Sequence, residues 1–324
     1  MTEFCTAHHH VECGEESRHN DREDQLDEGY GHIMLLRIKE TVEPVSRGYL
    51  VDELDPDYPP LCYACDDTHR QGGIVIWCHN GRGMEAPVAA ALGKLDAFNL
   101  FDPHWMEPEY RIWYAMLNCG LRLPASTGSD WFISSGNRVY VHTGDAFRYE
   151  DWVAGLQAGR SVITNGPALF LIVDDAMPGT VLRRDPGKGL DVRVSWISHY
   201  ALDKVEVLWN GTVAAAKQFP EGSSQGEFTT RLPAPSDGWV AARVFSRNLD
   251  SFYQPVYAHT SPVYVLTGVR SPGRQEAAAG FVASIDSALE KINHRFLFRS
   301  EAQRREVVDL FRKGQDVYKG ILHS

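Results

Sequence analysis

The sequence predicts a mixed fold in which an α/β part is followed by an antiparallel β-sandwich and then by a helical hairpin. Between about residues 30 and 132, short apolar runs alternate with helical stretches. From about 138 to 266 apolar residues recur every second position, and the last 50 residues have helical spacing. We therefore expect three regions, at 1–137, 138–270 and 271–324.

The composition excludes some classes of function. The 324 residues carry a formal net charge of −11, which argues against a nucleic-acid partner. No apolar run reaches the ~20 residues that a membrane-spanning helix needs. The acidic, polar start of the chain does not resemble a signal peptide. We expect a cytoplasmic protein with no membrane span, and leave an exported, longer form open.

The α/β part is predicted from nearly continuous apolar runs. These strands are expected at 32–38, 74–78, 97–101 and 121–124, with helical segments at 58–71 and 87–94 between them. Buried strands that alternate with helices are typical of a parallel sheet or barrel. Only four such strands can be recognised, so a barrel built from them is partial and its edges are open; a homo-oligomer is one way to cover those edges.

The sandwich is predicted from alternation and turn chemistry. Val192, Val194 and Trp196 alternate with polar residues, and Val205, Val207 and Trp209 do the same. Asn210-Gly211 then supplies the residues that a tight hairpin requires. Further strands are expected at 239–245 and 263–265, after a helix at 150–158 that Gly159 ends.

The C-terminal hairpin is predicted from two apolar stripes. Phe281, Ile285, Leu289, Ile292 and Phe296 fall on one helical face. Ser300 and Gln303 have capping-box spacing and predict the start of a second helix. The stripe of the second helix comprises Val307, Leu310, Phe311, Val317 and Ile321. Both stripes are interpreted as core packing.

The six cysteines all lie within the first 120 residues. Cys62 and Cys65 form a C-x-x-C pair, but no second pair follows at zinc-site spacing, and the segment has helical character. We interpret these thiols as buried rather than as a metal or redox site.

Four residues with metal-binding side chains stand at the ends of predicted strands. Glu16 follows Gly14, His32 opens a strand, His79 ends one, and Asp130 follows another. Carboxylate and imidazole groups on rigid supports are the ligands that a divalent metal of hard or borderline character prefers. Arg82, in a Gly-Arg-Gly loop, and Arg138 are candidate contacts for a substrate anion.

The order of these motifs resembles that of the PHP (polymerase and histidinol phosphatase) metallohydrolases, and in particular their CehA/McbA-like branch. The stretches that carry the resemblance are GGIVIWCHNGRG, AALGKLDAFNLF, LNCGLRLPASTGSD, AGRSVITNGPALFL and AHTSPVYV, within about residues 12–266.

The resemblance implies a distorted (βα) barrel with one to three zinc, manganese or iron ions. Glu16 would be a bridging carboxylate, His32 and His79 imidazole ligands, and Asp130 the last carboxylate ligand. Glu16, His79, Asp130 and Arg82 would form the catalytic set. The expected reaction is hydrolysis of a small phosphoester, carboxyl ester or carbamate ester by a metal-activated water.

The chain departs from the family at two places. The family's upstream H-x-H strand is missing, so the barrel is expected to be truncated; His8, His9 and His10 are either an exposed tail or a replacement for these ligands. Phe132 stands where the family's last histidine is expected. Fewer ligands imply an open, wet site with weakened metal affinity. The rival hypothesis is an inactive remnant that binds a partner through its β-sandwich.

Overall fold

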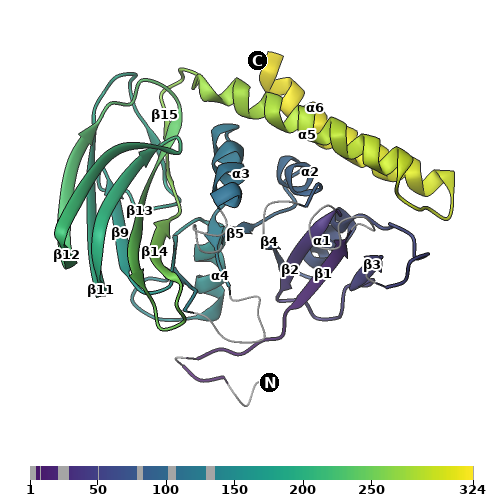
Figure 1. Ribbon diagram of the computed structural model, residues 1–324, viewed down its shortest axis with the longest axis horizontal. Coiled ribbons are helices and arrows are strands. Elements are labelled where there is room, and N and C mark those ends of the chain that lie inside the picture. Colours follow the sequence, from purple (N-terminus) through teal and green to yellow (C-terminus); the bar gives the residue numbers. More distant parts are fainter. Residues whose placement is uncertain are drawn as a thin grey trace. The chain divides into compact units, whose positions relative to one another are not determined.

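The computed structural model describes residues 5–7, 9–20, 29–49, 51–78, 83–100, 107–128 and 136–323. The chain divides into two compact units (Figure 1). Unit 1 combines Met1–Asp96 with Arg274–Ser324, and unit 2 is Ala97–Gly273. Within the described ranges the protein has six helices and large sheets, which confirms the mixed α and β class.

The sheet of unit 1 has the strand order β3-β1-β2-β4. Its strands are β1 (Glu15–Asn20), β2 (Gly31–Leu36), β3 (Ser46–Gly48) and β4 (Ile74–Cys78). β2 is antiparallel to both β1 and β4, and only β3 runs parallel to its neighbour β1. This differs from the expected parallel arrangement, because a buried strand is apolar throughout whichever way its neighbour runs.

The two faces of this sheet differ in chemistry. Alternation places Ile33 and Leu35 of β2 on the same face as Val75 and Trp77 of β4, and all four side chains are fully buried. The helix α1 (Leu61–Arg70) contacts β1, β2 and β4. The opposite face carries Glu16, Arg18 and Asn20 of β1. The other three residues of β1 are also polar, so this strand escapes a search for apolar runs.

The helices α5 (Gly273–His294) and α6 (Glu301–His323) confirm the predicted C-terminal pair. α6 packs on α2 (Ala86–Ala91), where the Tyr318 hydroxyl donates to the Pro87 carbonyl at 2.8 Å. At the start of α6 the Ser300 hydroxyl accepts the Gln303 N–H. The Gln303 side chain accepts the N–H of Arg299 instead of that of Ser300, so the capping box is shifted by one residue on that side.

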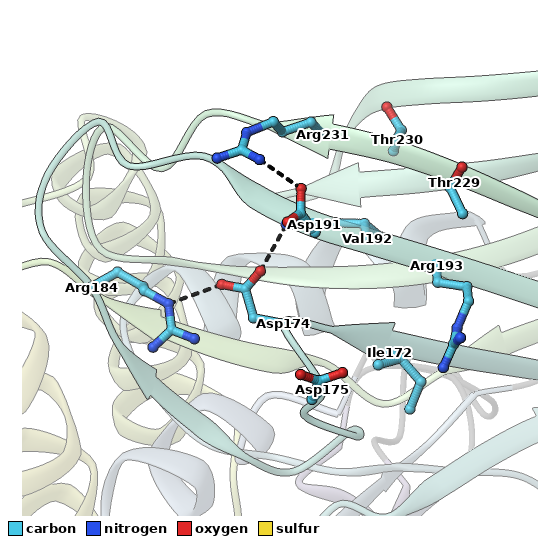
Figure 2. A pocket seen from close by; sticks show the side chains of 10 residues that line it. All are labelled: Ile172, Asp174, Asp175, Arg184, Asp191, Val192, Arg193, Thr229, Thr230 and Arg231. Carbon is cyan, nitrogen blue, oxygen red and sulfur yellow. Dashed lines mark hydrogen bonds and ion pairs between the residues drawn. The ribbon is translucent and has the colours of Figure 1, made fainter.

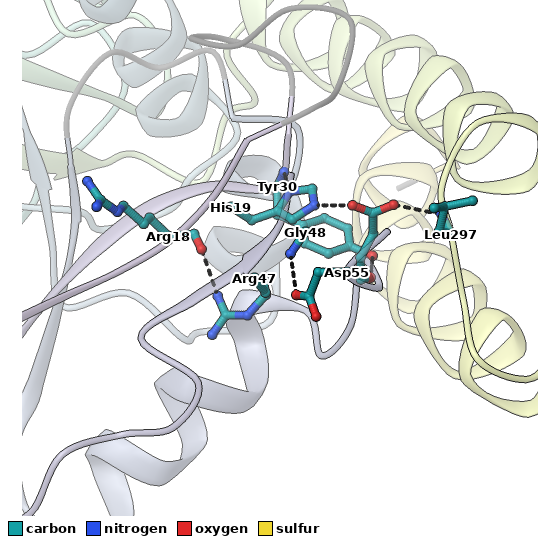
Figure 3. A network of polar contacts seen from close by, with 8 residues as sticks. Arg18, His19, Tyr30, Arg47, Gly48, Asp55 and Leu297 are labelled. Carbon is teal, nitrogen blue, oxygen red and sulfur yellow. Dashed lines mark hydrogen bonds and ion pairs between the residues drawn. The ribbon is translucent and has the colours of Figure 1, made fainter. Parts of the chain in front are cut away.

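A buried network fixes the α5–α6 connection to β1 (Figure 3). His19 Nε2 lies 2.8 Å from Asp57 Oδ1, and the two side chains are 0% and 1% exposed. The Asp57 carboxylate also accepts the Leu297 N–H at 2.6 Å, while His19 Nδ1 accepts the Tyr30 N–H. Both ring nitrogens of His19 are therefore used in holding the fold together.

The thiols of α1 are buried, as predicted. Cys62 and Cys65 are free and almost fully enclosed, and burial raises the pKa of both thiols well above the usual value. The buried Glu85 carboxylate accepts the N–H groups of Leu61 and Cys62 and so satisfies the start of the helix. No helix in the described ranges is long and apolar enough to cross a membrane.

Unit 2 contains a short parallel pair and a large sheet. The pair is β5 (Ala97–Asn99) with β6 (Ala125–Ser126), and the helices are α3 (Glu107–Asn118) and α4 (Tyr149–Gln157). The sheet has nine strands: β7 (Arg138–Val141), β8 (Ser161–Thr164), β9 (Ala168–Val173), β10 (Val181–Arg183), β11 (Leu190–Trp209), β12 (Thr212–Leu232), β13 (Gly238–Leu249), β14 (Pro255–Thr260) and β15 (Val263–Leu266).

The large sheet doubles over on itself, because β9 pairs with β11 and also packs against β13 and β14 without pairing. Val192, Val194 and Trp196 point into the enclosed core, as do Val205 and Val207. The alternation therefore predicted the inner face correctly. Trp209 is only partly buried against this core.

The turn between β11 and β12 has the predicted chemistry. Asn210 and Gly211 have φ values of 51° and 85°, as a tight turn of this hairpin requires. A Cβ at Gly211 would lie 3.0 Å from Cδ2 of Tyr114, a residue of α3. Glycine is therefore needed at this position for both backbone conformation and packing.

A buried polar network holds α3 on the sheet. His259 Nε2 accepts the Tyr114 hydroxyl at 2.7 Å, and His259 Nδ1 donates to the Thr260 carbonyl. Arg243 stands beside Tyr114 and pairs with Glu206 at 2.6 Å. Burial lowers the pKa of His259 to about 3, with Arg243 acting in the same direction, so the imidazole is neutral.

Candidate metal centre

The structure brings together two of the predicted metal ligands. Glu16 of β1 and His32 of β2 lie on neighbouring antiparallel strands, and Glu16 Oε1 is 3.1 Å from His32 Nδ1. The side chains are 37% and 17% exposed, so the pair is sheltered but accessible from solvent. A carboxylate and an imidazole therefore meet on the polar face of the unit 1 sheet.

His32 belongs to a row of residues that crosses all four strands of this sheet. In register, Ser46 of β3 is opposite Arg18, Arg18 is opposite His32, and His32 is opposite Cys78. Residues directly opposite each other project from the same face. Glu16, two positions before Arg18 in β1, also belongs to this face. The row ends at Cys78, the last residue of β4.

Asn20 determines which nitrogen of His32 carries a proton. The Asn20 Oδ1 atom lies 2.6 Å from His32 Nε2 and can only accept, so Nε2 is the donor. In the neutral ring, Nδ1 then has a lone pair directed at the Glu16 carboxylate, which is also an acceptor. Two acceptors 3.1 Å apart need a proton or a cation between them.

The pair supplies two ligand atoms of the kind that a divalent metal ion accepts. Two ligand atoms about 2.1 Å from one metal and about 90–110° apart are separated by roughly 3.0–3.4 Å. The 3.1 Å between Glu16 Oε1 and His32 Nδ1 falls within that interval. The Asn20 contact is the outer interaction that a ligating histidine needs to keep its ring oriented. Glu16 and His32 would be two ligands of such a site, and a third is not found among the described residues.

The positions of the other predicted site residues relative to this pair are not given by the described part of the chain. His79, Arg82 and Asp130 lie outside the described residues, as do His8 and Phe132. In the described ranges no group of three or more His, Cys, Asp or Glu side chains could hold a metal ion.

Two further predicted residues are described but lie elsewhere. His10 of the histidine run has Nδ1 3.8 Å from Cys5 Sγ and Nε2 3.5 Å from Glu12. The chain between them is held in a turn, where Thr6 and His9 exchange backbone hydrogen bonds. Arg138 is an exposed residue at the start of β7 in unit 2.

Sequence reasoning missed Asn20 and Arg18. Both belong to the stretch Glu15–Asn20, which is polar throughout and was not recognised as a strand. The available signal was the even spacing of Glu16, Arg18 and Asn20, which places them on one face once the stretch is extended.

A separate groove of about 720 Å³ lies on the outer surface of β9, β11 and β12 in unit 2 (Figure 2). Its lining residues are Ile172, Asp174, Asp175, Arg184, Asp191, Val192, Arg193, Thr229, Thr230 and Arg231. Arg184 pairs with Asp174 and Arg231 with Asp191, each at 2.9 Å. Asp174 also accepts the Asp191 N–H, which links the two pairs.

Comparison with known proteins identifies no family. No protein-family model matches the chain, and no curated protein matches it. Among solved structures, the CARDB domain of a Pyrococcus furiosus protein, determined in complex with di-metal ions, matches with 17% identity and a TM-score of 0.21. The match covers 31% of this chain and 94% of that domain, and a similarity this low carries no argument about function.

Proposed function

We propose that this protein is a metal-dependent hydrolase of ester bonds, related to the PHP metallohydrolases. The observation that carries the proposal is the Glu16–His32 pair, whose 3.1 Å separation and fixed tautomer suit a shared divalent ion. The proposed ion is zinc, manganese or iron, because these metals accept carboxylate and imidazole ligands. His79, Asp130 and Arg82 complete the proposed site on the strength of the sequence resemblance.

The residues of this face have separate tasks in the proposed reaction. A bound divalent ion would lower the pKa of a water molecule so that it can attack an ester. Glu16 supplies negative charge, and its partial exposure leaves room for that water. Asn20 keeps the His32 ring in one orientation by accepting the Nε2 proton.

The test compares metal content and turnover in matched variants of the whole chain. Glu16→Gln and His32→Gln remove one donor each, and His69→Gln is the control. His69 pairs with Asp96 at 2.9 Å and is 33% exposed, so it is a histidine–carboxylate pair of the same kind away from this face. Metal would be titrated in, because a site with few ligands is expected to bind it weakly.

We expect the two site variants to lose metal binding and chelator-sensitive hydrolysis of bis(p-nitrophenyl) phosphate or p-nitrophenyl acetate. The His69→Gln protein should keep both. Equal metal binding by wild type and both site variants, with unchanged far-UV circular dichroism, would refute the proposal.

The groove in unit 2 favours one alternative function, a binding module. Arg193 and Asp175 line it, and neither has a side-chain hydrogen bond or ion pair to another described residue. Figure 2 shows both without a dashed contact, beside Ile172. A zwitterionic ligand would match one free charge of each sign. If the protein binds a zwitterionic ligand, and this binding survives Glu16→Gln but is lost in Arg193→Gln, the result would favour this alternative.

A further inference from the structure

Arg18 stands on the same face as the proposed metal site and is exposed to solvent. It is directly opposite His32 across the β1–β2 pair and two residues after Glu16 in β1. In Figure 3 its side chain extends away from His19 of β1 and Arg47 of β3, which are buried. The guanidinium is therefore available to a molecule that approaches Glu16 and His32.

The charge of Arg18 is not neutralised by a carboxylate in the part of the chain that the structure describes. Its side-chain contact is from Nε to the Ser46 hydroxyl at 3.2 Å. Other arginines of the chain, such as Arg184, Arg231 and Arg243, pair with carboxylates at 2.6–2.9 Å. Because Ser46 holds Nε, the two terminal nitrogens keep the fork that matches two oxygens of a phosphate or carboxylate.

We propose that Arg18 is the substrate-anion contact of this site and that the substrate is a phosphoester that carries a negative charge. This inference rests on the proposed hydrolase function and narrows its substrate class. One phosphate oxygen would face the ion at Glu16 and His32, and another would meet the Arg18 fork. A neutral carboxyl or carbamate ester offers no charge for Arg18 to bind.

The test measures binding of phenylphosphonate, a non-hydrolysable analogue of an aryl phosphate, to the whole chain by titration calorimetry. Arg18→Gln removes the charge and the guanidinium fork and keeps a polar side chain. Arg70→Gln is the matched control, because Arg70 is 75% exposed on α1 and already paired with Asp67. Loss of a charged hydrogen-bonded contact should weaken binding by about tenfold or more in Arg18→Gln and leave Arg70→Gln unchanged.

Metal content of the same proteins separates the two proposals. Arg18→Gln should bind as much manganese or zinc as wild type, since Arg18 is not a ligand. The KM for an aryl phosphate should rise in this variant while the KM for p-nitrophenyl acetate stays the same. Failure of wild type to bind metal refutes the hydrolase and leaves the phosphonate result standing. Equal phosphonate affinity in wild type and Arg18→Gln, or none in wild type, overturns the role of Arg18.

Discussion

Asn20 is the residue whose role is easiest to overlook, because it is an uncharged side chain beside candidate ligands. Its Oδ1 accepts the Nε2 proton of His32 and leaves Nδ1 facing Glu16. Outer-shell contacts of this kind typically contribute about 10–100-fold to metal affinity. In the proposed site, Asn20 would therefore contribute to metal affinity without touching the ion.

We predict that Asn20→Leu, which keeps the size of the side chain, weakens zinc or manganese binding by about 10–100-fold. The reason is loss of ring orientation, because His32 and Glu16 both remain. Competition with a fluorescent chelator measures the affinity. Unaltered affinity in this variant would show that His32 does not bind metal through Nδ1.

The buried His259 leads to a prediction about how the free energy of unfolding depends on pH. Its pKa in the folded protein is about 3, below the unfolded value of about 6.5, so the unfolded chain takes up the proton first as pH falls. Stability contributed by the neutral ring is complete above pH 6.5 and decreases by about 1.4 kcal/mol per pH unit between 6.5 and 3. The buried imidazole is thus a source of acid sensitivity in unit 2.

Replacing His259 by Gln should lower stability at pH 7, because the Tyr114 hydroxyl loses its acceptor geometry. It should also reduce the loss of unfolding free energy between pH 6 and 4 by about 2 kcal/mol. Urea unfolding at both pH values measures this difference. The exposed His199, replaced in the same way, serves as the control. An unchanged pH dependence in His259→Gln would show that another group is responsible.

Among the elements, the β11–β12 turn shows how one glycine serves two requirements. Gly211 has φ of +85° and faces Tyr114, whereas Gly187 has φ of +79° with nothing within 4 Å of its ideal Cβ. The two positions therefore share a backbone requirement and differ in packing. Comparing them separates backbone strain from steric contact.

We predict that Gly187→Ala costs about 1 kcal/mol and Gly211→Ala about 2 kcal/mol or more of unfolding free energy. The additional cost at Gly211 comes from the 3.0 Å approach of the new methyl group to Cδ2 of Tyr114. Denaturant titration of both proteins provides the measurement. Equal costs would mean that α3 moves aside without loss of stability.

The elements also show why sequence predicts part of this protein and not the rest. β4 was found because every residue from Ile74 to Cys78 is apolar, and β11 because its apolar residues alternate. β1 has neither pattern, since its sequence EESRHN is polar. The contact between Glu16 and His32 requires the antiparallel register of β1 and β2, which hydropathy does not contain. Asn20 and Arg18 join the site only through that register.

At the scale of the whole molecule, unit 1 is completed by a segment that follows unit 2 in the sequence. α6 packs on α2 through Gly314, where a Cβ would lie 2.9 Å from the Val88 Cα. Gly320 in the same helix has nothing within 4 Å of its ideal Cβ. This pair of glycines gives a matched test of how far the C-terminal helices stabilise the sheet of unit 1.

We predict that Gly314→Leu disrupts the α2–α6 contact and accelerates hydrogen exchange in β1, β2 and β4, whereas Gly320→Leu does not. Exchange in β11, β12 and β13 should remain as in wild type, because the core between these strands and β9 belongs to unit 2. Exchange followed by mass spectrometry resolves the two units. Uniform acceleration across both units would show that they unfold as one cooperative body.

This arrangement affects how the protein can fold during its synthesis on the ribosome. Residues of β1, β2 and β4 emerge before unit 2, but Leu297, Gly314 and Tyr318 emerge only after all of unit 2 has been made. Unit 2 is continuous in sequence and can fold during synthesis. Unit 1 is complete only when its two sequence segments, which are separated by the whole of unit 2, come into contact. During that interval α2 is not covered by α6, and Asp57 lacks the N–H group of Leu297. Nascent chains of this protein should therefore depend on holding chaperones until the segment Arg274–Ser324 has been made.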